Sequence, residues 1–218
     1  MERRKGKTPD GEVLTTDWLM PAVRDDDVAA AHPCAEQPCV HRMLAECPAD
    51  QIVRLANAIG LLTALGKVLP PEPVDIWRRE IRALRNATAL WDAIAAEDAA
   101  ALRRIVPQHQ ATKGKELVRL AREHLARKVA EKMAGTRFEL AIAPDGEQDQ
   151  FVIRYRPMRL IDAIWQRFAE EIAGTITCAK CAAPKCGRWF PRSAGRSDRR
   201  FCCHACQMRF RRTAAGNL

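Results

Sequence analysis

The 218-residue chain lacks any long apolar stretch. A membrane-spanning helix needs about 18 or more consecutive apolar residues, and no such run occurs, so we expect no membrane segment. The chain begins MERRKGKTPDGEV, which is charged and has no apolar core of the kind found in a signal peptide. We therefore expect a cytoplasmic protein whose cysteines stay reduced.

Motifs of the common enzyme classes are also missing. The sequence has no phosphate-binding loop, dinucleotide-binding glycine fingerprint, Gly-x-Ser-x-Gly elbow or His-Glu-x-x-His pair. His124 lies beside the apolar stripe of a predicted helix with no nucleophile or metal-binding companion, which is typical of a histidine at the edge of a core. We expect no enzyme activity.

Acidic residues are scarce in the last part of the chain. Residues 177–218 contain ten basic residues and one acidic residue, Asp198, and this net charge of +9 equals that of the whole chain. The first 176 residues, with 26 basic and 26 acidic side chains, are therefore neutral in sum. A basic excess confined to one small segment favours contact with a polyanion, although a solvated basic tail would have the same composition.

The same segment holds six of the nine cysteines. Cys181 and Cys186 are separated by four residues, Cys202 and Cys206 by three, and the two pairs by fifteen. Two close pairs of thiolates are typical of a tetrahedral zinc site, and Gly187 permits the positive φ of a tight cysteine turn. We predict that these four cysteines bind one Zn²⁺.

Other pairings within this segment stay open. Two residues separate Cys178 from Cys181, two separate Cys203 from Cys206, and His204 could replace a sulfur. Disulfides or unpaired thiols are further alternatives, but free cysteines do not normally fall into two close pairs around a glycine-containing turn.

The predicted zinc module has a treble-clef-like plan of cysteine turn, hairpin and helix. Trp189-Phe190 is predicted as its first strand and residues 199–201 as its second, with a helix beginning near Cys206. Because arginine suits phosphate geometry, we predict that arginines of this module bind nucleic acid, DNA first and RNA as an alternative. The predicted contacts are Arg188, Arg192, Arg199, Arg200, Arg209, Arg211 and Arg212.

This segment resembles a known family. The run Cys181-x4-Cys186-Gly-Arg-Trp-Phe, followed by Arg-Arg-Phe-Cys202, Cys206 and a basic helix, is similar to the bacterial CGNR-type zinc-finger proteins. The likeness covers residues 157–213, and the name-giving Cys-Gly-Asn-Arg reads Cys206-Gln-Met-Arg209 here. The resemblance implies the same four zinc ligands, a preceding helical ABATE domain and a role as a stress-induced transcription regulator.

The rest of the chain predicts a mainly α fold with one β-hairpin (α+β). We expect a polar, partly disordered arm over 1–31, a helical ABATE-like domain over 32–175 and the zinc-finger module over 176–213. Apolar periodicity predicts helices over 49–69, from about Asp75, over 98–106 and 112–134, and from Pro157, whereas alternation predicts the hairpin near 137–155. Such a domain would sense a small-molecule effector or form a homodimer.

A second group of possible metal ligands lies near the amino terminus. Cys34, Cys39, His41 and Cys47 fall within fourteen residues and could bind a second metal ion, but they lack a glycine turn, and isolated cysteines often serve as small buried apolar residues.

The leading function is a DNA-binding transcription regulator. The alternative is a ligand-binding or protein-interaction protein in which the finger is only a structural cap.

Overall fold

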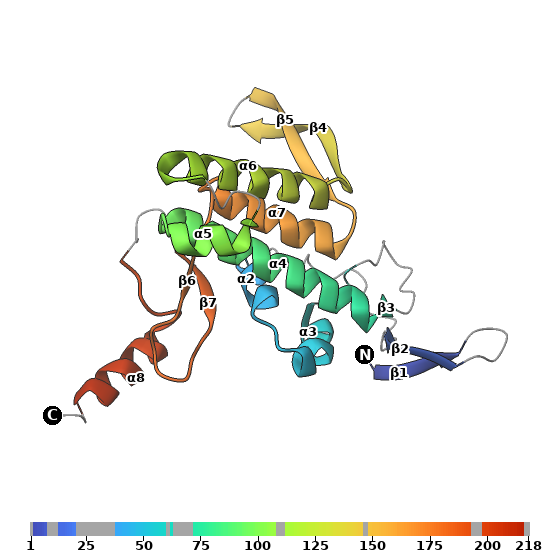
Figure 1. Ribbon diagram of the computed structural model, residues 1–218, viewed down its shortest axis with the longest axis horizontal. Helices are drawn as coiled ribbons and strands as arrows, with labels where there is room; N and C mark the ends of the chain where they lie inside the picture. Colours follow the sequence, from blue (N-terminus) through green and yellow to red (C-terminus); the bar gives the residue numbers. More distant parts are fainter. Residues whose placement is uncertain are drawn as a thin grey trace.

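The computed structural model describes residues 2–7, 13–20, 38–59, 62, 72–107, 112–145, 148–192 and 198–215. Over these residues the chain is mostly helical, with small antiparallel sheets (Figure 1). The helices are α2 (Val40–Ala45), the 3-10 helix η1 (Ala49–Gln51), α3 (Ile52–Ile59), α4 (Val74–Ala95), α5 (Ala99–Ile105), α6 (Gly114–Lys132), α7 (Leu160–Ile172) and α8 (His204–Ala215). The strands are β1 (Glu2–Lys7), β2 (Val13–Met20), β3 (Glu72–Pro73), β4 (Thr136–Asp145), β5 (Gln148–Pro157), β6 (Thr177–Lys180) and β7 (Trp189–Arg192).

The long helix α4 is the centre of the helical body. It packs against α2, α5 and α6, while α7 packs against α2 and α6. Its apolar residues recur at spacings of three and four, and Trp77, Ile81 and Leu84 are buried as predicted. On the other face Arg78, Arg79 and Arg82 are exposed.

The body continues from α4 into α5 and α6 as the apolar periodicity predicts. Asp98 caps α5, because its side chain accepts hydrogen bonds from the backbone N–H of Ala100 and Ala101, each at 3.0 Å. Leu125 and Trp165 lie in the same core, from α6 and α7 respectively. The predicted helix over 49–69 is found as η1 and α3, and its last part lies outside the described residues.

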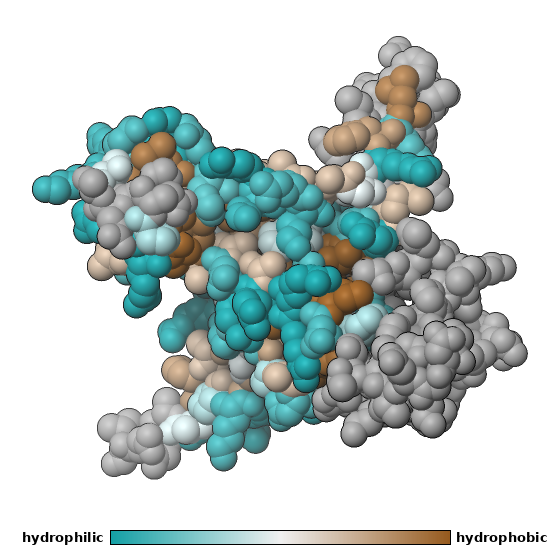
Figure 2. Space-filling model, turned by 45° about the vertical axis from the view of Figure 1, so that its right-hand side comes forward, coloured by the Kyte–Doolittle hydropathy of each residue, from teal (hydrophilic) through white to brown (hydrophobic). Residues whose placement is uncertain are grey.

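The predicted hairpin near 137–155 is confirmed as β4 and β5. The strands are antiparallel, and Phe138 pairs with Tyr155 and Leu140 with Ile153, so residues of the two predicted alternating sets lie opposite one another. Phe138 and Leu140 are 69% and 71% exposed. On the face in Figure 2, hydrophilic residues cover much of the described surface, and hydrophobic residues gather in small separate groups.

The amino-terminal segment differs from its expectation. Sequence analysis assigned no strand to residues 1–31, whereas β1 pairs with β2, and β2 pairs with β3 just before α4. Residues 21–37, which include Cys34, lie outside the described part. Among the helices of the described residues, none combines the length and the apolar character that crossing a membrane requires.

Replacing Leu84 with alanine tests the assignment of the core. Leu84 is fully buried in α4, so the lost contacts and the cavity should lower the free energy of unfolding by about 2–5 kcal/mol. The matched control is Leu140→Ala on the exposed face of β4, which should change it by less than about 0.5 kcal/mol. Urea unfolding followed by circular dichroism measures both, and equal effects would contradict this core.

Candidate metal centre

Four cysteine sulfurs meet at one point of the carboxy-terminal module. The Sγ atoms of Cys181, Cys186, Cys202 and Cys206 form a group that could hold a metal ion, all within 4.8 Å of one another. The Sγ–Sγ distances are 3.8 Å between Cys186 and Cys202, 3.6 Å between Cys202 and Cys206, and 3.6 Å between Cys206 and Cys186. A tetrahedron with metal–sulfur bonds of about 2.3 Å has edges of about 3.8 Å, so the donors fit a zinc ion.

The first two sulfurs are positioned by a tight turn that follows β6. The Cys186 N–H donates to the Ala183 carbonyl at 3.2 Å, and the Cys181 N–H donates to the Arg188 carbonyl at 2.9 Å. Lys185 and Gly187 both adopt the left-handed conformation, with φ of 60° and 62°. The positive φ predicted for Gly187 is therefore confirmed.

The other two sulfurs lie at the start of α8. Cys202 precedes the helix, Cys206 lies in its first turn, and the Cys202 N–H points at the Cys181 sulfur at 3.5 Å. Cys203 is exposed and lies outside the group of four, although its sulfur is 3.9 Å from that of Cys202. His204 is exposed and is not part of the group.

The predicted second strand over residues 199–201 is wrong. Instead, β7 pairs with β6, with Ala179 opposite Phe190 and Thr177 opposite Arg192. The physical reason is the cysteine turn itself. It reverses the chain, so the strand that enters it pairs with the strand that leaves it.

The apolar core of the module is very small. It consists of the buried residues Ala179, Cys181, Ala183, Phe190 and Cys206, with Cys186, Phe201 and Cys202 partly buried against it. Four of these eight residues are the metal-binding candidates. A unit of this size cannot be stabilised by apolar burial alone, so a shared metal ion would supply much of its folding free energy.

The four thiols also influence one another electrostatically. Burial acts to raise the pKa of Cys181, but hydrogen bonds from the backbone N–H of Cys202 and Ala183 and from neighbouring thiols lower it to about 7. Burial and the adjacent thiols raise the pKa of Cys202. A divalent ion at this group would bind the thiolate forms and displace the thiol protons.

The predicted nucleic-acid contacts divide into two sets. Arg192 Nε donates to the Arg199 carbonyl at 3.1 Å, Arg199 Nε donates to the Phe201 carbonyl at 2.9 Å, and the Arg200 guanidinium lies 5.5 Å from the Phe210 ring centre. These three arginines therefore brace the module. The side chains of the other four, Arg188, Arg209, Arg211 and Arg212, are exposed and have no hydrogen-bond or ion-pair partner among the described residues.

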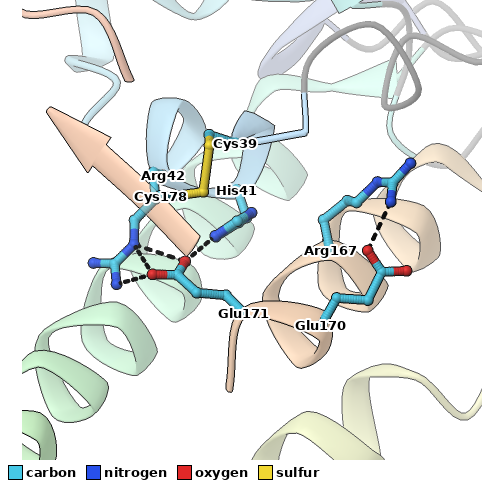
Figure 3. The surroundings of a disulfide bond; sticks show 7 residues. All are labelled: Cys39, His41, Arg42, Arg167, Glu170, Glu171 and Cys178. Atoms are coloured by element: carbon cyan, nitrogen blue, oxygen red, sulfur yellow. Dashed lines mark hydrogen bonds and ion pairs between the residues drawn. A yellow bond between two sulfur atoms is a disulfide. The ribbon is translucent and has the colours of Figure 1, made fainter. Parts of the chain in front are cut away.

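Cys178 is not one of the four metal-binding candidates. It forms a disulfide with Cys39 at the start of α2, with the two Cα atoms 5.9 Å apart, and so joins β6 to the helical body (Figure 3). The expectation that every cysteine stays reduced does not hold in this structure. Sequence analysis considered Cys39 and Cys178 as ligands of two different sites, and nothing in their spacing indicated that they meet.

Among the described residues, the amino-terminal candidates Cys39, His41 and Cys47 do not form one metal-binding group by themselves. His41 is fully buried and its Nε2 contacts Glu171 of α7, while Nδ1 has no hydrogen-bond partner in the described structure. Cys47 is a buried free thiol that donates to the Pro48 carbonyl at 3.4 Å. Cys34 lies outside the described residues.

A buried ion pair lies beside the disulfide. Arg42 Nη2 donates to Glu171 Oε1 at 2.6 Å (Figure 3). Arg42 Nη1 donates to Asp92 Oδ2 at 2.9 Å. Burial acts to raise the pKa of Glu171, but hydrogen bonds from His41 and Arg42 more than offset this, so its pKa lies below the ordinary value. The Arg42 guanidinium also lies 5.2 Å from the Trp189 ring centre, so the ion pair touches the carboxy-terminal module.

Comparison with models of known protein families, with curated proteins and with solved structures found no match.

Replacing Cys206 with serine tests the metal-binding group. If these cysteines bind an ion, the variant should lose that metal and the fold of β6, β7 and α8, because the ion would link both ends of the module. Cys203→Ser is the matched control and should keep full metal content, since Cys203 lies outside the group. Elemental analysis and limited proteolysis measure the two effects, and loss of metal from the control with retention in Cys206→Ser would show that Cys203 is the ligand.

Proposed function

We propose that this chain is a nucleic-acid-binding protein, a DNA-binding regulator of transcription, in which a zinc ion folds a basic carboxy-terminal module. The placement of α8 carries the proposal. The helix extends away from the helical body in Figure 1, and its first turn is tied to the four-sulfur group through Cys206. An ion at that group would hold α8 in a fixed direction.

The charge of α8 supports a polyanionic partner. Arg209, Arg211 and Arg212 are exposed within four consecutive residues, and the described part of the helix contains no acidic side chain. Guanidinium groups bind phosphate through two parallel hydrogen bonds, so three of them on one protruding helix suit the backbone of a duplex. Arg188, at the end of the cysteine turn, adds a fourth exposed cation.

The two sets of arginines would have different roles, one structural and one in binding phosphates. The guanidiniums of Arg192 and Arg199 donate to backbone carbonyls close to the metal-binding cysteines, so they hold the loop before α8 in place. The exposed set would supply affinity through phosphates, and base reading would be left to the few side chains of α8 that reach a groove. The likeness of this segment to the CGNR-type fingers agrees with this assignment.

The helical body offers a place for an effector. A cavity of about 550 Å³ lies between α4, α5, α6 and α7, and Leu90, Arg104, Lys128 and Trp165 are among its lining residues. This volume is within the range of small-molecule sites, and the lining combines apolar residues with basic residues and the acidic Glu131, which suits a small polar effector. Homodimerisation of the body is the other role proposed for it.

The docking of the module favours a second candidate function. Lys180 of β6 donates to Glu46 at 2.8 Å, and the Cys39–Cys178 disulfide and the Arg42–Trp189 contact join the same two parts. These contacts fit a structural cap on a ligand-binding or protein-interaction domain. In that case the charge of α8 would serve solubility alone.

Charge removal on two surfaces separates these functions. Changing Arg209, Arg211 and Arg212 together to glutamine should weaken binding to a labelled DNA duplex, because three phosphate contacts are lost. Each lost contact should make the negative slope of log affinity against log salt less steep by about 0.9, or about 2.7 for three. The matched control changes Arg78, Arg79 and Arg82, which are exposed on α4, and removes the same charge. Its slope should stay at the wild-type value.

Fluorescence anisotropy across a salt series, on DNA and on RNA of the same sequence, gives both slopes. A wild-type protein with no salt-dependent binding to either polymer would favour the structural cap. Equal losses of DNA affinity in the two triple variants would mean that binding depends only on net charge and that α8 is not the contact surface.

A further inference from the structure

A second group of metal-binding side chains lies where the module meets the helical body. Ligand atoms of His41, Glu171 and Cys178 all lie within 4.8 Å of one another, and the sulfur of Cys39 is bonded to that of Cys178. Figure 3 shows His41 and Glu171 turned toward each other beside the two sulfurs. The four residues come from α2, α7 and β6, so only the folded chain assembles them.

We propose that Cys39, His41, Glu171 and Cys178 form a second zinc site when the disulfide between the two cysteines is reduced. Two thiolates, one imidazole and one carboxylate are all ordinary zinc ligands, and four protein donors would make a closed, structural site. The disulfide and the zinc-bound dithiolate are alternative states of the same two sulfurs. The proposal does not depend on nucleic-acid binding.

The charge around the group fits a divalent cation. Two thiolates and the Glu171 carboxylate would carry three negative charges against the two positive charges of zinc, which leaves one negative charge. Arg42 supplies the compensating positive charge, since its Nη2 donates to Glu171 Oε1 at 2.6 Å and its Nε donates to Oε2 at 3.0 Å, while His41 Nε2 also contacts Oε2. Arg42 would hold the carboxylate as outer-shell partners do in metal sites, and zinc would take the place of the His41 contact at Oε2.

Burial also favours a metal ion over a solvated dithiol. His41 is fully buried and Glu171 is 8% exposed, so water has little access to either ligand. Zinc binding there would join β6, α2 and α7 in a reducing environment, where a disulfide does not persist. The link between the module and the helical body would then survive reduction.

A phosphine reductant supplies two electrons to the Cys39–Cys178 disulfide and breaks the S–S bond. The phosphine takes an oxygen atom from water and becomes a phosphine oxide, and the two protons of that water bind to the two sulfurs, which become thiols. Zinc then replaces both thiol protons, which are released to solvent. No other oxidant or reductant takes part.

Zinc stoichiometry of the full chain tests the proposal. The wild-type protein, reduced with tris(2-carboxyethyl)phosphine and saturated with zinc, should retain two ions per chain after gel filtration, one at each group. Cys178→Ser should retain one, because the group of Cys181, Cys186, Cys202 and Cys206 is untouched. Cys47→Ala is the matched control, since it removes a buried free thiol outside both groups, and it should retain two.

Cobalt(II) titration supplies a readout that does not depend on the cysteine variants. In the reduced wild type, a second equivalent of cobalt should add thiolate charge-transfer absorption, and Glu171→Gln should weaken that second binding step by at least about tenfold while leaving the first unchanged. One zinc ion in the reduced wild type, or two in Cys178→Ser, would overturn the proposal. So would an unchanged second step in Glu171→Gln.

Discussion

The fold of the carboxy-terminal module depends on the arrangement of four cysteine sulfur atoms. Cys181, Cys186, Cys202 and Cys206 approach one another at the edge lengths of a tetrahedron suited to zinc, and the apolar residues around them are too few to form a stable core alone. A shared ion would join the cysteine turn to the first turn of α8. The direction of α8, and with it the position of the exposed arginines, depends on that junction.

The connection between this module and the helical body is a second constraint. The Arg42–Glu171 ion pair is buried, with exposed side-chain fractions of 7% and 8%, and such a pair is costly to form unless its remaining hydrogen bonds are satisfied. Asp92 and His41 satisfy them, and the Trp189 ring covers the guanidinium. The same few side chains thus fix α2, α7 and β7 against one another and bring Cys39 to Cys178.

Local patterns predicted much of this structure. The apolar spacing of Trp77, Ile81 and Leu84 predicted α4, the alternation around Phe138 predicted the hairpin, and the position of Gly187 predicted the left-handed turn after Cys186. Each of these depends on residues close together in the chain. The predicted grouping of the four cysteines agrees with the closeness of their sulfurs, and the short spacing within each pair explains why each pair lies together.

Features that depend on distant segments were not predictable from the pattern. Cys39 meets Cys178 across 139 residues, and Glu171 was predicted only as part of a helix although it binds His41 and Arg42. The wrong strand over 199–201 has a different, local origin, because β6 carries no strong strand signal and its pairing with β7 comes from the turn between them. Nucleic-acid binding stays a prediction.

The most direct test of this account is a crystallographic anomalous difference map of the full chain at the zinc absorption edge. The account predicts a peak about 2.3 Å from the sulfurs of Cys181, Cys186, Cys202 and Cys206, with β6, β7 and α8 ordered around it. An ordered module with no peak among these sulfurs would contradict it.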